Sequence, residues 1–169
     1  MHKDSYEFLR ALEETPSVTG SEQPVAHLVR QRMKKWADKI TGDTHGDLIV
    51  CANPQGSPRV MLAGHMDQIG LMIHHVSDEG FLYFKAVGGI DVTVLPGSLL
   101  TVHTRKGPRP GVIGRKPIHL MKEEERKNPK LEISDLWVDI GAASRKEELQ
   151  QVEIGDVATY ALGGHAPGG

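Results

Sequence analysis

The sequence predicts an α/β fold in which the opening of a sheet domain precedes a small β-rich domain. Helical patterns and then apolar strand patterns occupy residues 1–67. After residue 68, short strand patterns follow one another closely, separated by turns that contain Gly and Pro. This second pattern is typical of a small barrel or sandwich. We therefore place a domain boundary near residue 68, with the second domain at 68–162 and a flexible Gly-rich tail at 163–169.

Two helices are expected at the start of the chain. Asp4-Ser5-Tyr6-Glu7 has the pattern of a capping box, and an apolar stripe follows it before Pro16. The second helix is expected to begin at Ser21 as its N-cap, since Pro24 is tolerated in a first turn. Its apolar residues recur at helical spacing and indicate a face that packs on the core; they are Val25, Leu28, Val29 and Trp36.

Two strands and a pair of polar residues follow the helices. Residues 46–52 form one strand pattern, and residues 58–63 form an apolar run that is typical of a strand buried on both faces. His65 and Asp67 come directly after this run, and in extended backbone they lie on the same side. A carboxylate beside a histidine fixes its tautomer, as a metal-binding imidazole requires. On spacing alone, however, the commoner explanation is a hydrogen-bonded histidine at a strand end, with Asp67 as a turn residue.

The second domain is expected to contain six strands and one short helix. The strand patterns lie at residues 69–73, 81–87, 99–104, 111–114, 136–140 and 157–160. Ser144 to Gln151 is the expected helix, with Ser144 as its N-cap. Two acidic runs, at 123–125 and 147–148, are interpreted as solvated charges, because neither has the strand-end context of metal ligands.

The composition excludes several classes of function. Charged residues make up 25% and hydrophobic residues 38% of the chain, as in ordinary soluble domains. A net charge of -2 and a pI of about 6.5 argue against a nucleic-acid or anionic-membrane partner. No apolar run approaches the roughly 20 residues that span a bilayer. Cys51 is the single cysteine and the start of the chain has no signal-peptide core, so a cytoplasmic location is expected.

Residues 62–72, Leu-Ala-Gly-His-Met-Asp-Gln-Ile-Gly-Leu-Met, resemble the first metal-site motif of the M42 family of metallo-aminopeptidases. These are the glutamyl and deblocking aminopeptidases, some of which carry an older endoglucanase name. Further stretches resemble the family in the same order, and they lie at residues 16–22, 87–91, 94–97, 111–117 and 138–142. Several ordered motifs are far more specific than a His-x-Asp pattern alone. The resemblance extends to about Tyr160.

The resemblance implies an aminopeptidase-type α/β sheet domain that is incomplete here and is followed by a PDZ-like domain. In the family, the PDZ-like domain mediates dimerisation and larger assembly, so a homo-oligomer through residues 68–162 is expected. The family's site holds two divalent metal ions, zinc or cobalt. His65 matches a ligand of one metal, and Asp67 matches the carboxylate that orients a ligand.

The remaining family motifs, a bridging Asp, a Glu-Glu pair and further ligands, follow the inserted domain, and this chain reaches Gly169 before any of them. The expected protein is a truncated aminopeptidase for short peptides that is inactive by itself. The alternative is a stand-alone assembly module without catalysis. Carbohydrate hydrolysis is a weaker third hypothesis, because no carboxylate pair is placed by a recognisable motif for it.

Overall fold

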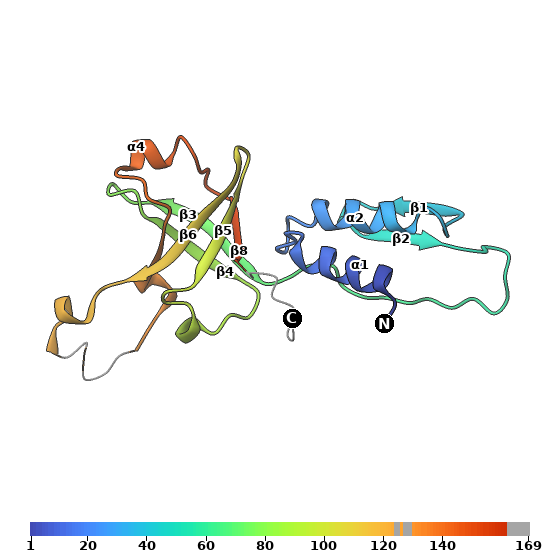
Figure 1. The fold of residues 1–169 in the computed structure, drawn as a ribbon, viewed down its shortest axis with the longest axis horizontal. Coiled ribbons are helices and arrows are strands. Elements are labelled where there is room, and N and C mark those ends of the chain that lie inside the picture. Colours follow the sequence, from blue (N-terminus) through green and yellow to red (C-terminus); the bar gives the residue numbers. More distant parts are fainter. Residues whose placement is uncertain (124–125, 127–129, 162–169) are drawn as a thin grey trace. The chain divides into compact units, whose positions relative to one another are not determined.

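The computed structural model describes residues 1–123, 126 and 130–161 (Figure 1). These residues divide into two compact units, of which the first spans Met1–Gln68 and the second begins at Ile69. We refer to them as the N-terminal unit and the barrel unit. The tail expected at 163–169 and part of the acidic run at 123–125 lie outside the described residues.

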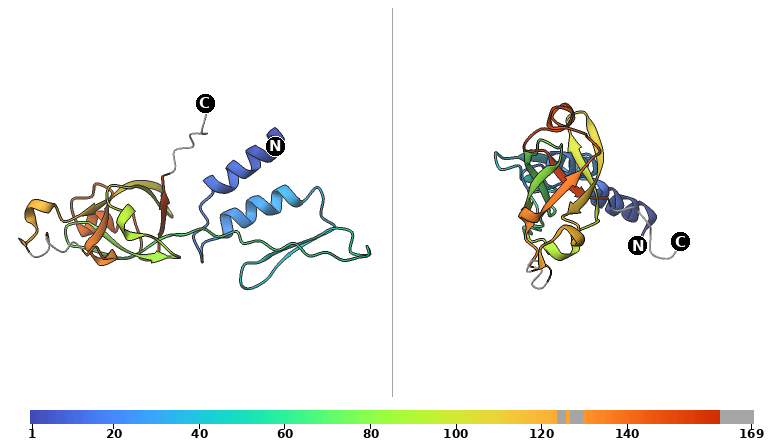
Figure 2. Two further views of the ribbon diagram at one scale, coloured as in Figure 1. Left: turned by 90° about the horizontal axis from the view of Figure 1, so that it is seen from below. Right: turned by 90° about the vertical axis from the view of Figure 1, so that its left-hand side faces the viewer.

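Two helices form the first part of the N-terminal unit, as predicted, but their caps differ from those expected. Helix α1 spans Lys3–Glu14, and helix α2 spans Gln23–Met33 and contacts strand β2 (Leu48–Cys51), which follows it (Figure 2). The predicted capping box at Asp4 is wrong, because the Asp4 carboxylate accepts two hydrogen bonds from the Arg32 guanidinium of α2. The predicted Ser21 cap is also wrong, since Glu22 is the N-cap residue of α2.

The apolar stripe of α2 is only partly buried. Val25 is 2% exposed, but Trp36, which was expected on the same core-facing side, is 51% exposed. Its ring lies instead beneath two cations, with the Arg32 guanidinium carbon 5.2 Å and the Lys35 ammonium nitrogen 4.1 Å from the ring centroid. Such contacts stabilise an aromatic ring at the surface without removing it from water.

A two-stranded antiparallel sheet completes the regular structure of the N-terminal unit. Strand β1 (Lys39–Gly42) pairs with β2 (Leu48–Cys51), and β2 confirms the strand predicted at 46–52. The strand predicted at 58–63 is absent, and Val60, Met61 and Leu62 are 78%, 88% and 92% exposed. A buried strand needs a hydrogen-bonded neighbour and apolar layers on both faces, and the described residues supply neither to this run. An open cleft of about 1110 Å³ is lined by this run and by β2.

The barrel unit confirms the prediction of a small β-structure. Within the described residues, its six strands close in the order β3-β4-β7-β6-β5-β8, and every neighbouring pair is antiparallel (Figure 1). The strands are β3 (Gly70–Val76), β4 (Leu82–Val87), β5 (Leu99–Thr104), β6 (Gly107–Arg115), β7 (Leu136–Asp139) and β8 (Val157–Tyr160). The short helices are η1 (Val92–Val94), η2 (Ile118–Leu120), η3 (Ile133–Asp135) and α4 (Arg145–Glu148).

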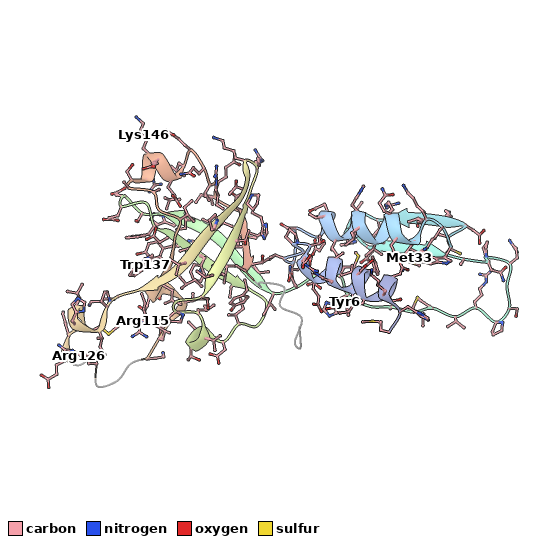
Figure 3. All side chains as sticks on the ribbon, viewed as in Figure 1. Tyr6, Met33, Arg115, Arg126, Trp137 and Lys146 are labelled. Carbon is pink, nitrogen blue, oxygen red and sulfur yellow. The ribbon has the colours of Figure 1, made fainter. Side chains whose placement is uncertain are left out.

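A continuous apolar core fills the barrel. Alternate residues of the strands supply it, as expected for a sheet with one buried face. Its members include Leu71, Ile73, Leu82, Phe84, Leu100, Val102, Ile113, Val138 and Ala158. On β6, Gly114 allows Trp137 of β7 to lie close to the strand, because a Cβ atom at Gly114 would stand 2.5 Å from the indole Nε1 (Figure 3).

Helix α4 carries a buried carboxyl group. Ser144 caps this helix as predicted, and its Oγ accepts a hydrogen bond from the Glu147 N–H. Glu148, however, is 0% exposed, and neither of its carboxyl oxygens has a hydrogen-bond partner in the described part of the chain. Burial, together with the nearby Asp139 and Glu147 carboxylates, raises the pKa of Glu148 to about 7. The expectation that 147–148 is a solvated acidic run is therefore wrong for Glu148.

Candidate active site

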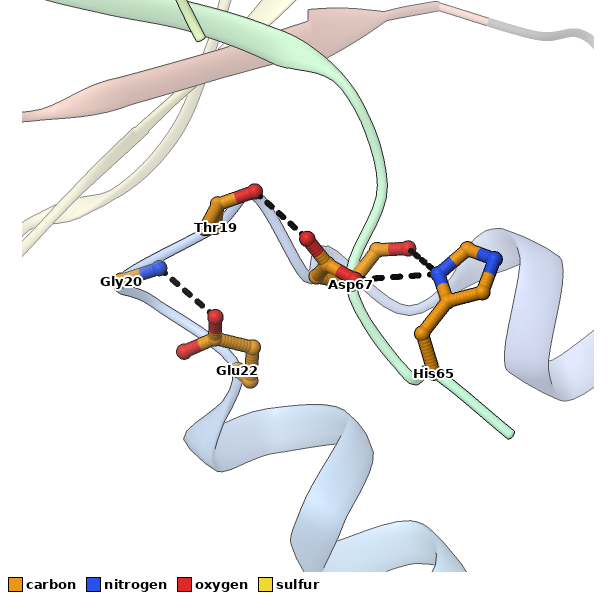
Figure 4. A network of polar contacts seen from close by, with 5 residues as sticks. All are labelled: Thr19, Gly20, Glu22, His65 and Asp67. Atoms are coloured by element: carbon orange, nitrogen blue, oxygen red, sulfur yellow. Dashed lines mark hydrogen bonds and ion pairs between the residues drawn. The ribbon is translucent and has the colours of Figure 1, made fainter. Parts of the chain in front are cut away.

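His65 and Asp67 form a hydrogen-bonded pair in the N-terminal unit. The His65 Nδ1 atom lies 3.0 Å from Asp67 Oδ1 and 3.0 Å from the Asp67 backbone oxygen (Figure 4). Both neighbours are acceptors, so Nδ1 must carry the proton that it donates. In the neutral ring this leaves a lone pair on Nε2, which points away from Asp67 (Figure 4). The side chain of His65 is 86% exposed, so Nε2 is open to an incoming metal ion.

The Asp67 carboxylate is held from its other side by Thr19. The Thr19 hydroxyl donates a 2.7 Å hydrogen bond to Asp67 Oδ2, while Oδ1 receives the proton of His65 (Figure 4). The Thr19 hydrogen bond, followed by that of His65, lowers the pKa of Asp67 below its ordinary value. Asp67 is therefore ionised near neutral pH, and both of its carboxylate oxygens act as acceptors.

Backbone pairing brings these distant residues together. The Gln68 N–H donates to the Ser17 carbonyl at 2.9 Å, and Val18 and Gln68 form an isolated parallel bridge. Ser17 and Val18 are 3% and 0% exposed, so the segment before Thr19 is fixed in the small core of the unit. Sequence reasoning missed Thr19 as a member of the site. The available signal was its place in the stretch 16–22, one of those that resemble the family.

The pair fits one part of a metal site and not the whole of it. Catalytic zinc takes about three protein ligands and a water molecule. Among the described residues, no group of three or more His, Cys, Asp or Glu side chains could hold a metal ion. His65 can supply one imidazole nitrogen, and Asp67 orients that imidazole as carboxylates do beside metal-binding histidines. The described residues therefore contain a ligand and its orienting group, while the other ligands are missing from them.

The sequence of the region around this pair matches one family model. The model describes M42 glutamyl aminopeptidases and matches residues 46–163. The chain belongs to the M42 glutamyl aminopeptidase family. This assignment confirms the resemblance inferred from residues 62–72 and from the later motifs. The site roles of His65 and Asp67 stay predictions.

Relatives of this M42 chain agree with the family assignment, but they are longer than this chain. The lysyl aminopeptidase of Pyrococcus furiosus is 36% identical over 92% of this chain and 45% of its own length. The TET aminopeptidase structure from a marine sediment archaeon of the Thaumarchaeota matches with a TM-score of 0.88 and 33% identity. This match covers 94% of this chain and 45% of that one. The chain thus spans about half the length of the curated relatives that it matches.

A further M42-like structure adds information on assembly. The TET1 peptidase of Pyrococcus horikoshii, which can assemble into a tetrahedron or a large octahedral shell, matches with a TM-score of 0.80 and 38% identity. The match covers 92% of this chain and 46% of that one. In the M42 chain described here, no helix among the described residues is long and apolar enough to cross a membrane.

Proposed function

We propose that this chain is the N-terminal part of a dinuclear metal-dependent aminopeptidase that removes N-terminal residues from short peptides. His65 is the proposed ligand of one metal ion through Nε2, and Asp67 is the proposed carboxylate that orients its ring. The observation that carries this proposal is the Nδ1–H hydrogen bond to Asp67, which leaves Nε2 open to solvent. The pair lies inside the stretch that the family model matches, residues 46–163.

The two metal ions, zinc or cobalt, supply an activated water and a polarised peptide carbonyl when they are bound. The part played by this chain is to hold one imidazole at a fixed tautomer and orientation. One imidazole cannot retain an ion, and the described residues contain no group of three or more side chains that could hold one. We therefore propose that the remaining ligands and the base lie in the part of the relatives that this chain does not span. The 169-residue chain is then inactive alone.

The proposed domain organisation assigns 1–67 to the catalytic α/β domain and 68–162 to an inserted PDZ-like domain that mediates homo-oligomerisation. The division of the structure after Gln68 and the closed barrel support this assignment. The shells formed by the TET1 peptidase of P. horikoshii support assembly. The proposed location is the cytoplasm, which the single Cys51 supports.

The exposed run at Val60–Leu62 supports the view that the α/β domain is incomplete. Three consecutive large apolar side chains that face water are unusual in a finished domain. They line the open cleft beside β2. We propose that further strands and helices of the catalytic domain cover this run, so that it becomes the buried strand that its composition predicts.

The test compares the 169-residue chain with the product of its gene including any coding sequence beyond Gly169. Both are assayed on a panel of aminoacyl chromogenic substrates with zinc or cobalt. We expect metal-dependent hydrolysis by the longer product, its loss in His65→Ala, and no hydrolysis by the 169-residue chain. Hydrolysis by the longer product that survives His65→Ala would overturn the assignment of His65. Metal-dependent hydrolysis by the 169-residue chain would overturn its assignment as an inactive part.

The second candidate function is a stand-alone assembly module. The closed barrel favours it, because this unit buries its own core within the chain. A stop codon directly after Gly169, together with a defined oligomer and no hydrolysis, is the result that this alternative predicts.

A further inference from the structure

Thr19 is the residue of the site to which no role has been given so far. Its hydroxyl donates a 2.7 Å hydrogen bond to Asp67 Oδ2, and His65 Nδ1 bonds to Oδ1 of the same carboxylate (Figure 4). We propose that Thr19 is a positioning residue: it fixes the Asp67 carboxylate so that Oδ1 receives the Nδ1 proton of His65 and Nε2 keeps its lone pair. The assignment of that lone pair to a metal ion rests on the function proposed above.

A second hydrogen bond is needed because one does not fix a carboxylate. The terminal torsion of an aspartate is broad, so a carboxylate held by a single partner can rotate. With Thr19 on Oδ2 and His65 on Oδ1, each oxygen has its own donor, and the carboxylate plane is defined. A fixed acceptor beside Nδ1 favours the Nδ1–H tautomer over the Nε2–H tautomer.

The backbone holds Thr19 in place for this task. Val18, the preceding residue, is fully buried and forms a parallel bridge with Gln68, the residue after Asp67. Gly20, the following residue, turns with a φ of 89° and donates its N–H to Glu22 Oε1 at 2.7 Å (Figure 4). A β-branched threonine also has few side-chain rotamers. Thr19 and Asp67 are therefore anchored to each other through neighbouring backbone, and the hydroxyl does not depend on a mobile loop for its position.

A purely structural role predicts a different result. Thr19 and Asp67 are on the surface of the unit, where one hydrogen bond contributes little to stability. The barrel unit contains a matched pair, because Thr93 Oγ1 donates to Asp91 Oδ1 at 2.7 Å, also at the surface. Removing either hydroxyl should have a similar small effect on folding. Only the loss of the Thr19 hydroxyl should change the tautomer of His65.

The experiment measures the ring nitrogens of His65 by long-range 1H–15N NMR in the full 169-residue chain. Spectra are recorded at about pH 8.5, where free imidazole is neutral. The unaltered chain should show mainly the Nδ1–H tautomer. Thr19→Val should lower the ratio of Nδ1–H to Nε2–H about fivefold, the equivalent of one hydrogen bond. Thr19→Ser should restore the ratio, and Thr93→Val should leave it unchanged. Asp67→Ala removes both carboxylate oxygens and leaves the backbone oxygen of residue 67 as the acceptor, so it gives the lower limit of the ratio.

The outcomes separate this inference from the proposed function. An unchanged tautomer ratio in Thr19→Val, with dispersed amide signals that show a folded chain, would overturn the positioning role. A predominant Nε2–H tautomer in the unaltered chain would overturn it as well. The absence of metal-dependent hydrolysis in the complete gene product would overturn the proposed function, and it would leave the tautomer result as it stands.

Discussion

The two units of this chain bury their apolar residues to very different degrees. Val18 and Val25 are the buried apolar residues of the N-terminal unit within the described sequence, and all others belong to the barrel unit. The barrel closes its sheet on itself, so every strand has two neighbours and one face of the sheet is sealed. In the N-terminal unit, β1 and β2 pair only with each other and leave two open edges. Closure of the sheet, more than apolar content, therefore decides whether a unit buries its apolar residues within itself.

The largest expected effect is on the barrel core. Phe84 is 2% exposed, and Phe84→Ala should lower the free energy of unfolding of the barrel unit by about 3–5 kcal/mol. The chain has one tryptophan in each unit, Trp36 and Trp137. Urea titrations of the Trp36→Phe and Trp137→Phe backgrounds therefore follow the units separately. Phe84→Ala should shift the transition reported by Trp137 to lower urea concentration and leave the transition reported by Trp36 unchanged. Equal shifts of both would show that the units unfold together.

The next effect is a dependence of the barrel on pH through Glu148. Its folded pKa of about 7 lies above the ordinary value of 4.5, so the folded state binds more protons between these values. The contribution of Glu148 to stability is therefore greatest below about pH 4.5, and it falls as the pH rises to about 7, by on the order of 3 kcal/mol. Glu148→Gln should remove this fall, as urea titrations of Trp137 at several pH values can show. Glu153→Gln, at an exposed ion pair with Arg105, is the matched control and should retain the fall.

A smaller effect on stability, but a clear one on association, is expected in the N-terminal unit. Leu62 is 92% exposed, so Leu62→Asp should change the unfolding free energy by no more than about 0.5 kcal/mol. It should nevertheless reduce concentration-dependent light scattering, because the exposed apolar run then repels a second copy. Ile118→Asp, at a similarly exposed position on the barrel unit, is the comparison. If Ile118→Asp alone reduces the scattering, association does not depend on the Val60–Leu62 run.

The smallest expected effect is that of metal on the 169-residue chain. Since His65 belongs to no group of three or more possible ligands among the described residues, zinc should bind too weakly to raise the melting temperature. Dialysis against zinc followed by elemental analysis should find less than one ion per chain, with the same value in His65→Ala. Stoichiometric zinc that disappears in His65→Ala would mean that a complete site forms, for example across chains.

Local patterns predicted the barrel well and the N-terminal sheet poorly. Apolar alternation at residues 69–73, and short strand-like runs between Gly and Pro turns elsewhere, marked the barrel strands. Strand β6 starts at Gly107, earlier than predicted, because Pro108 and Pro110 look like turn residues in sequence. Strand β1 was missed because it is four residues long and mostly polar. The run at 58–63 was predicted from its composition, but a strand also depends on neighbours that lie elsewhere in sequence.

The site shows the same limit. The closeness of His65 and Asp67 followed from their two-residue spacing, and the structure bears it out with a 3.0 Å hydrogen bond. Thr19 stands 48 positions before Asp67, and no spacing rule connects them. Glu148 was expected in water because charged residues usually are, and its burial depends on how α4 packs on the barrel. Long-range contacts of this kind are decided by tertiary packing.

The closure of the barrel also has a consequence for biosynthesis. Strand β8 pairs with both β3 and β5, so the first strand of the barrel is completed by the last one. A nascent chain that has produced β3 to β7 therefore carries two unpaired sheet edges, and it retains them until Val157–Tyr160 leaves the ribosome. Contacts between such distant segments also form slowly. During this interval the exposed edges of β3 and β5 are open to pairing with other chains, so the order of the strands in the sequence affects the risk of aggregation during synthesis.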